Sequence, residues 1–109
     1  MIMWFDKLYI DESLKKHKKR CMKQIEAQKL WKRSYTVIVL ASNEEDLFDI
    51  MESREMFFKY YRRKKVYIAG VAENPESALE LLQQMLLDSY EKGEFSPRRT
   101  FSKEHFVCG

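Results

Sequence analysis

Two short segments of the chain are continuously apolar and rich in β-branched residues. They are residues 35–41, Tyr-Thr-Val-Ile-Val-Leu-Ala, and residues 66–72, Val-Tyr-Ile-Ala-Gly-Val-Ala. Runs of this kind are typical of strands that are covered on both faces, as in parallel sheets. The segment between them is long enough to hold a crossover helix, so the pattern predicts a parallel βαβ unit with a right-handed crossover.

The crossover helix is expected to begin at Ser42, which can cap it while Glu45 returns the hydrogen bond. Apolar side chains then recur at helical spacing and are expected to face the sheet. This stripe consists of Leu47, Ile50, Met51, Phe57, Phe58 and Tyr61. Arg54 falls within the stripe, where its guanidinium either reaches solvent beside a carboxylate or binds an anionic ligand.

A further helix is predicted from Asn74-Pro75-Glu76, which supplies an N-cap residue, a proline for the first helical position and an early carboxylate. Gly93 is placed to end this helix in the left-handed conformation. Its apolar positions cover a broad face, from which we expect deep packing. They are Ala78, Leu79, Leu81, Leu82, Met85, Leu86 and Tyr90.

The remaining segments give weaker patterns. Residues 13–30 are expected to form a helix with a narrow apolar stripe. The stripe consists of Leu14, His17, Cys21, Ile25 and Gln28. Residues 4–10 and residues 95–101 are candidate outer strands, and Pro97 limits the second of these to a sheet edge. Residues 102–109 are expected to form a flexible tail.

These elements predict a small layered α/β fold with a parallel βαβ core. The expected order is (β)αβαβα(β), with three to four strands flanked by three helices. Residues 1–109 are expected to form a single α/β domain, because 109 residues are too few for a second folding unit. The chain is 45% hydrophobic and 14% aromatic with only three glycines and two prolines, which indicates a real core and excludes a disordered or collagen-like chain.

Positive charge is concentrated near the start of the chain. Residues 1–35 hold ten Lys or Arg against four Asp or Glu, a net charge of +6, which leaves ten against thirteen, or −3, in residues 36–109. The basic helix at 14–33 is therefore a candidate for binding nucleic-acid phosphates. The candidate contacts are Lys15, Lys16, Lys19, Arg20 and Lys23. The alternative is that these side chains only solvate a helix face.

Signatures of catalysis, metal binding and cofactor binding are missing from the sequence. His17 and His105 lack metal-ligand spacing, and neither a GxGxxG nor a GxxxxGK[ST] motif occurs. We therefore expect no cofactor, no metal and no catalytic residues. Because Cys21 and Cys108 show no pairing motif, and no apolar stretch resembles a secretory leader or a membrane span, we expect a cytoplasmic protein with free thiols that does not enter a membrane.

The ends of the two core strands offer a candidate ligand site. If the strands are parallel, the turns that follow them leave the same edge of the sheet beside two helix N-termini, where ligands often bind. The candidate ligand-binding residues are Ser42, Asn43, Arg54 and Asn74. Plain helix capping is the competing explanation for these residue types.

Large apolar side chains are left off the predicted core stripes. On the crossover helix these are Phe48, Met56 and Tyr60. Clustered methionine and aromatic side chains are what protein interfaces select. Our first expectation is accordingly a non-enzymatic interaction domain that self-associates or docks on a protein partner. An accessory nucleic-acid-binding protein and a ligand-binding or catalytic α/β domain are the alternatives.

Overall fold

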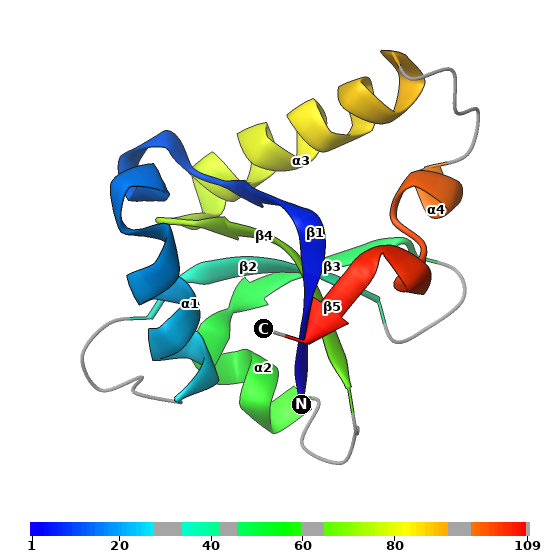
Figure 1. Ribbon diagram of the computed structural model, residues 1–109. Coiled ribbons are helices and arrows are strands. Elements are labelled where there is room, and N and C mark those ends of the chain that lie inside the picture. The colour runs from blue at the N-terminus through cyan, green and yellow to red at the C-terminus, as the bar shows by residue number, and fades with distance from the viewer. Residues whose placement is uncertain (28–33, 42–45, 60–64, 92–96, 109) are drawn as a thin grey trace.

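The computed structural model describes residues 1–27, 34–41, 46–59, 65–91 and 97–108, and it has both strands and helices (Figure 1). The strands are β1 (Ile2–Ile10), β2 (Thr36–Leu40), β3 (Phe48–Glu52), β4 (Val66–Ala72) and β5 (Phe106–Cys108). The α-helices are α1 (Lys18–Glu26), α2 (Ser53–Lys59), α3 (Pro75–Glu91) and α4 (Pro97–Thr100). Two 3-10 helices are η1 (Glu12–His17) and η2 (Lys103–His105). The mixed α/β class predicted from the sequence is confirmed.

Among the described residues, the strands form one five-stranded sheet in the order β3-β2-β4-β1-β5. Strand β1 runs parallel to β4, with Ile2 opposite Val66 and Ile10 opposite Val71. The other neighbouring pairs, β2 with β3, β2 with β4 and β1 with β5, are antiparallel. The sheet is therefore mixed and mostly antiparallel.

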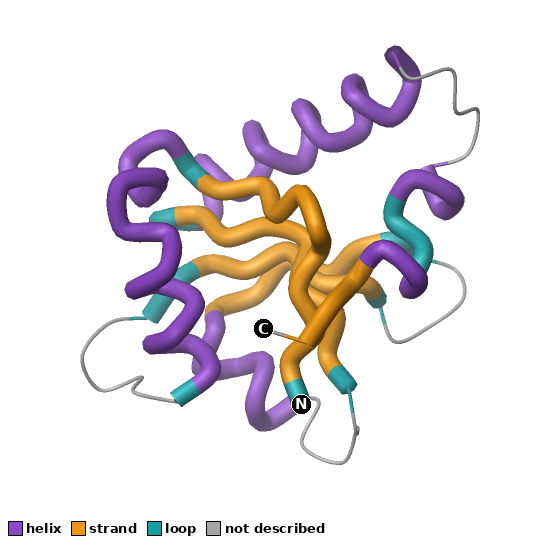
Figure 2. The backbone as a smooth tube through the Cα atoms, in the orientation of Figure 1, coloured by secondary structure: helices purple, strands orange, loops and turns teal. Residues whose placement is uncertain are grey.

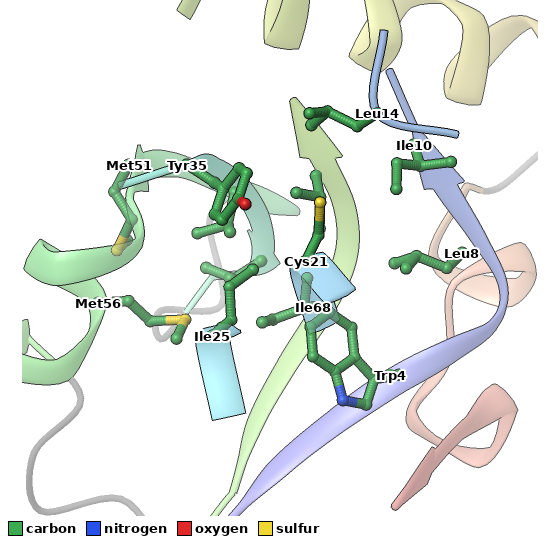
Figure 3. Packing of buried hydrophobic residues seen from close by; sticks show 13 residues of the cluster. Trp4, Leu8, Ile10, Leu14, Cys21, Ile25, Tyr35, Met51, Met56 and Ile68 are labelled. Atoms are coloured by element: carbon green, nitrogen blue, oxygen red, sulfur yellow. The ribbon is translucent and has the colours of Figure 1, made fainter. Parts of the chain in front are cut away.

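Helices cover both faces of the sheet (Figures 1 and 2). On one face, η1, α1 and α2 pack over a buried cluster that contains Trp4, Cys21, Ile25, Met56 and Ile68 (Figure 3). On the other face, α3 and the segment after α4 pack over a second buried cluster. That cluster consists of Phe5, Ile38, Ala69, Ala72, Ala78, Met85, Phe101 and Phe106.

The predicted parallel pairing of residues 35–41 with residues 66–72 is wrong. Thr36 of β2 lies opposite Ala72 of β4, so these two strands run antiparallel. The parallel partner of β4 is β1, which was expected only as an outer strand. The error follows from the first half of the segment between the two strands, which folds back on β2 as the antiparallel strand β3 before α2 crosses over β2 to β4.

The prediction of a crossover helix after Ser42 is also wrong for the first half of that helix. Residues 48–52 form β3, which pairs with β2 from Leu40 opposite Phe48 to Thr36 opposite Glu52, and helix α2 begins only at Ser53. A short apolar run fits a helical and a strand period equally well. The open edge of β2 decides between them, because β3 satisfies its backbone hydrogen-bonding groups.

The C-terminal predictions fail for similar reasons. Residues 97–100 form α4, and Pro97 occupies the first helical position instead of limiting an edge strand. Residues 103–108, expected in a flexible tail, form η2 and β5, and β5 pairs antiparallel with β1. Phe106 is 4% exposed, and its ring lies 5.3 Å from that of Phe5. A strand of three residues is too short to leave a period in the sequence.

Several boundaries are predicted correctly. Strand β1 covers the expected residues 4–10, and the helix expected from residue 13 appears as η1 followed by α1, with Leu14, Cys21 and Ile25 buried. The expected end of that helix, residues 28–30 with Gln28, lies outside the described residues. Helix α3 begins at Pro75, and the backbone N–H of Ser77 donates to Asn74 Oδ1 at 2.8 Å. Asn74 is therefore an N-cap, as its position predicted.

We expect Asn74→Ala to lower the free energy of unfolding by about 0.5 to 2 kcal/mol, because the Ser77 N–H loses its acceptor. Urea unfolding measures the change. Asn74→Asp is the matched control, since its carboxylate keeps an acceptor at the cap. An equal loss in both variants would contradict the capping role.

We expect Met56→Ala to lower the free energy of unfolding by about 2 to 5 kcal/mol, because Met56 is 0% exposed and its removal leaves a cavity between α1, α2 and the sheet. The exposed Val107 gives the control. Val107→Ala is expected to change the free energy of unfolding by less than about 0.5 kcal/mol. Thermal unfolding that left Met56→Ala as stable as Val107→Ala would show that Met56 is not a core residue.

Candidate interaction surfaces

The structure places the two strand ends at which a ligand site was predicted apart from each other. Because β2 and β4 are antiparallel, Leu40 at the end of β2 and Ala72 at the end of β4 lie at opposite edges of the sheet. Ser42 and Asn43 lie outside the described residues. Asn74 therefore has no counterpart from the end of β2 beside it.

The other two candidates for ligand binding have local roles. The Asn74 side chain accepts the Ser77 N–H as a helix cap. Arg54 is exposed, and its Nε lies 3.9 Å from Glu52 Oε2, a loose ion pair at the surface. Of the two explanations for Arg54, the structure matches the solvent-exposed guanidinium beside a carboxylate.

The predicted interface residues are placed differently from the expectation. Met56 was expected outside the core and is fully buried, so it is not available to a partner. Phe48 is half-buried, with its ring 5.2 Å from the ring of Phe101 in an edge-to-face arrangement. Tyr60 lies outside the described residues.

Exposed apolar side chains instead gather on α3. Leu79 is 54% exposed, Leu87 56% and Tyr90 59%. Positions 79, 86 and 90 share one side of a helix, and position 87 lies next to them. We call Leu79, Leu86, Leu87 and Tyr90 the α3 stripe. Leu79 and Tyr90 were expected in the packed face, which the structure corrects.

Carboxylates accompany the α3 stripe. Helix α3 contains four acidic residues and no Lys, Arg or His between Pro75 and Glu91. Glu76, Glu80 and Glu91 are exposed, and their spacing from Leu87 places all four residues along one side of the helix. The α3 stripe therefore lies beside a row of negative charge.

The basic residues predicted to bind nucleic acid are all exposed. Lys15 pairs with Glu12 at 2.9 Å, one turn back in η1. Lys16, Lys19, Arg20 and Lys23 recur at spacings of three and four residues, and we call these four the α1 basic face. The structure therefore presents the charges that the sequence pattern predicted.

A hollow of about 390 Å³ lies on the α1 basic face. Its described lining consists of Lys19, Arg20, Lys23, Gln24 and Ala27. Most of this lining is carbon, because the long basic side chains contribute their aliphatic stems while their charged ends stay in water. The hollow thus has an apolar floor with a positive rim.

Two polar side chains of α1 accept hydrogen bonds from aromatic residues. Glu26, the one acidic residue of α1, accepts a hydrogen bond from Trp4 Nε1 at 2.6 Å. The Gln24 side chain accepts a hydrogen bond from the Tyr35 hydroxyl. Of the predicted apolar stripe, His17 is exposed and Cys21 is buried, so His17 does not belong to the core.

The α1 basic face and the α3 stripe lie on opposite sides of the molecule. Helices α1 and α3 cover opposite faces of the sheet (Figure 1), and their Lys, Arg and Glu side chains are exposed. The segment from Glu12 to Glu26 carries six Lys or Arg against two Glu, whereas α3 carries acidic side chains alone among its charged residues. The two outer layers therefore differ in the sign of their charge.

A polar hollow of about 470 Å³ lies between the end of β1 and the first half of α3. Tyr9 lines it, and its hydroxyl donates to Asp88 Oδ2 at 2.6 Å, while Gln84 Nε2 donates to Asp88 Oδ1 at 2.7 Å. Burial raises the pKa of Tyr9, and the hydrogen bond to Asp88 and the charge of Asp88 raise it further. Tyr9 is thus a hydrogen-bond donor and not a base.

Comparisons of the chain with protein-family models, with curated proteins and with solved structures found no match. None of the described helices combines the length and apolar character needed to cross a bilayer. Within the described ranges, His, Cys, Asp and Glu side chains do not gather in any group of three that could hold a metal ion.

In an alkaline titration of the folded protein, we expect one component of tyrosinate absorbance to appear late and to vanish in Tyr9→Phe, because the pKa of Tyr9 is raised. Since an unfolded tyrosine ionises near pH 10, the stabilisation by Tyr9 is complete below that pH and is lost as the pH rises toward its folded-state pKa. The exposed Tyr90 provides the control, and Tyr90→Phe should keep the late component. A late component that survived in Tyr9→Phe would contradict this assignment.

Proposed function

We propose that this protein is a non-enzymatic interaction domain that self-associates head to tail. The α3 stripe of one copy docks on the α1 basic face of a second copy. The observation that carries the proposal is the exposure of Leu79, Leu87 and Tyr90 on a helix whose charged residues are all acidic. Single exposed apolar residues are ordinary, but several on one helix face are typical of an interaction surface.

The shapes of the two surfaces support this docking. The hollow beside Lys19, Arg20 and Lys23 has an apolar floor, and its volume of about 390 Å³ accommodates a leucine or tyrosine side chain. Burying such a side chain contributes about 1.5 to 3 kcal/mol for a Leu-sized group. A large side chain that fills a pocket is the usual centre of a protein interface.

Charge selects the partner surface. Pairing α3 with α3 of a second copy would bring rows of glutamate together, and like charges across an interface are unfavourable. The α1 basic face places cations around the hollow, where Glu76, Glu80 and Glu91 can pair with them. Opposite potentials also speed the encounter and make it sensitive to salt.

The arrangement implies a heterologous interface. In a pair of copies, the α3 stripe of one copy docks on the α1 basic face of the other. The pair therefore still has one free α3 stripe and one free α1 basic face. Association then continues into a ring or an open chain. We place this assembly in the cytoplasm, an assignment supported by the buried thiol of Cys21 and the exposed thiol of Cys108, which are not joined.

We expect multi-angle light scattering at about 10 to 50 μM protein and low salt to show a mass above that of one chain, decreasing as salt rises. Two variants separate the surfaces. The α3 variant carries Leu79→Glu and Leu87→Glu, and the α1 variant carries Lys19→Glu, Arg20→Glu and Lys23→Glu. Each alone should be monomeric, because each lacks one of the two surfaces.

An equimolar mixture of the two variants should form a dimer of one copy of each, since the intact α3 stripe of one fits the intact α1 basic face of the other. The control carries Lys7→Glu, Lys65→Glu and Lys103→Glu, which lower the net charge as much as the α1 variant does. These three positions belong neither to the α1 basic face nor to the α3 stripe, so association should remain intact. A wild-type protein that stays monomeric at low salt refutes self-association. Loss of association in the α3 variant with an unaffected α1 variant refutes the head-to-tail arrangement.

A further inference from the structure

We infer that the α1 basic face also binds the phosphate backbone of nucleic acid, without reading its sequence. Binding itself needs only the isolated monomer. The regulatory consequence, that nucleic acid displaces the α3 stripe of a second copy from the same cations, rests on the proposed function.

The cations of the α1 basic face are available. Lys16, Lys19, Arg20 and Lys23 are exposed, and among the described residues the structure gives none of them a carboxylate partner, in contrast to Lys15 with Glu12. Glu26, the one acidic side chain of α1, accepts the Trp4 N–H. A phosphate arriving at this face therefore meets positive charge that is not already paired.

The spacing of these cations suits a phosphate chain. From Lys19 to Lys23 helix α1 advances about 6 Å, at about 1.5 Å per residue, and Lys16 extends the row into η1. One strand of duplex DNA rises about 3.4 Å per phosphate, so this part of α1 spans about two phosphate steps. A single nucleotide or a free phosphate would engage only part of the row, whereas a polymer engages all of it and releases counterions at each contact.

Arg20 and the hollow add a second kind of contact. A guanidinium presents several N–H donors in a plane and binds phosphate oxygens in pairs, which a lysine does not. The aliphatic floor between Lys19, Arg20 and Lys23 gives the sugar of a nucleotide an apolar surface to lie on. These contacts position a backbone but carry no information about the bases.

The charge of α3 influences which side of the protein faces nucleic acid. Helix α3 on the opposite side of the sheet is acidic and repels a polyanion, which favours contact through the α1 side. The described part of the α1 basic face has no aromatic side chain on which bases could stack, which again favours backbone contacts over base recognition.

Fluorescence anisotropy with a labelled oligothymidylate and the matching oligouridylate tests this inference. The protein is the α3 variant, in which self-association is removed and the α1 basic face is intact. We expect both probes to bind at about 50 mM salt and to weaken steeply toward about 200 mM. The single substitutions Lys19→Gln and Lys23→Gln should each reduce the slope of log affinity against log salt by about 0.7.

The α1 variant should bind each oligonucleotide at least about tenfold more weakly than wild type. The control with Lys7→Glu, Lys65→Glu and Lys103→Glu has the same net charge and should keep most of the affinity. Equal losses in the two variants would overturn the inference, because attraction would then depend on net charge and not on the α1 basic face. Absence of binding at about 50 mM salt overturns it as well.

Light scattering of wild-type protein with unlabelled oligothymidylate separates the two proposals. Binding by a protein that never self-associates supports this inference and refutes the proposed function. Self-association without oligonucleotide binding supports the proposed function and refutes this inference. Where both occur, oligothymidylate should return the assembly to complexes with one protein copy each, and an assembly that persists with oligonucleotide bound refutes the shared site.

Discussion

The central strand β4 has apolar residues on both of its faces, and the architecture follows from the need to cover both. Ile68 and Val71 face α1 and α2, while Ala69 and Ala72 face α3. Water can reach neither face without a loss of stability, so helices must lie on each side of the sheet. The exposed charges of α1 and α3 consequently lie mostly on the outer surfaces of these helices. The two outer surfaces point in opposite directions.

Helices α1 and α3 pack differently against the two faces of the sheet. On the α3 side β4 presents the small residues Ala69, Gly70 and Ala72, and at Gly70 an added methyl group would lie 3.2 Å from both Ile38 Cδ1 and Leu81 Cδ2. This close approach buries Ala78 and Met85 of α3, packs Leu81 and Leu82 partly against the sheet, and leaves Leu79, Leu87 and Tyr90 exposed. On the α1 side, large side chains such as Trp4, Ile25 and Met56 fill the space, and the outward residues are almost all charged. Among the residues that the structure describes, three of the five exposed large apolar side chains, Leu79, Leu87 and Tyr90, therefore lie on α3.

The sequence allowed prediction of the elements with strong local signals, among them the two apolar core strands and the capped start of α3 at Asn74. The prediction failed where local signals are ambiguous and long-range pairing decides. Residues 48–52 fit either a helix or a strand, and only the open edge of β2 selects the strand, which in turn reverses the direction of β2 relative to β4. That reversal separates the two strand ends at which the ligand site was predicted. Exposure of the α1 cations was foreseeable because nine Lys or Arg within residues 15–33 cannot be buried. The exposure of Leu79 and Tyr90 could not be predicted, because a broad apolar helix face does not show how much of it will contact the sheet.

Among the described residues, the opposite charges of η1 and α1 on one face and of α3 on the other contribute an electric dipole directed roughly across the sheet. A net charge of +3 describes only the sum of the charges and hides this separation. In the field of any charged surface, a dipole experiences a torque as well as a force, so the protein turns its α1 side toward negative charge before contact is made. Fewer orientations must then be searched for each productive collision, and the rate of encounter depends on the separation of charge more than on its total.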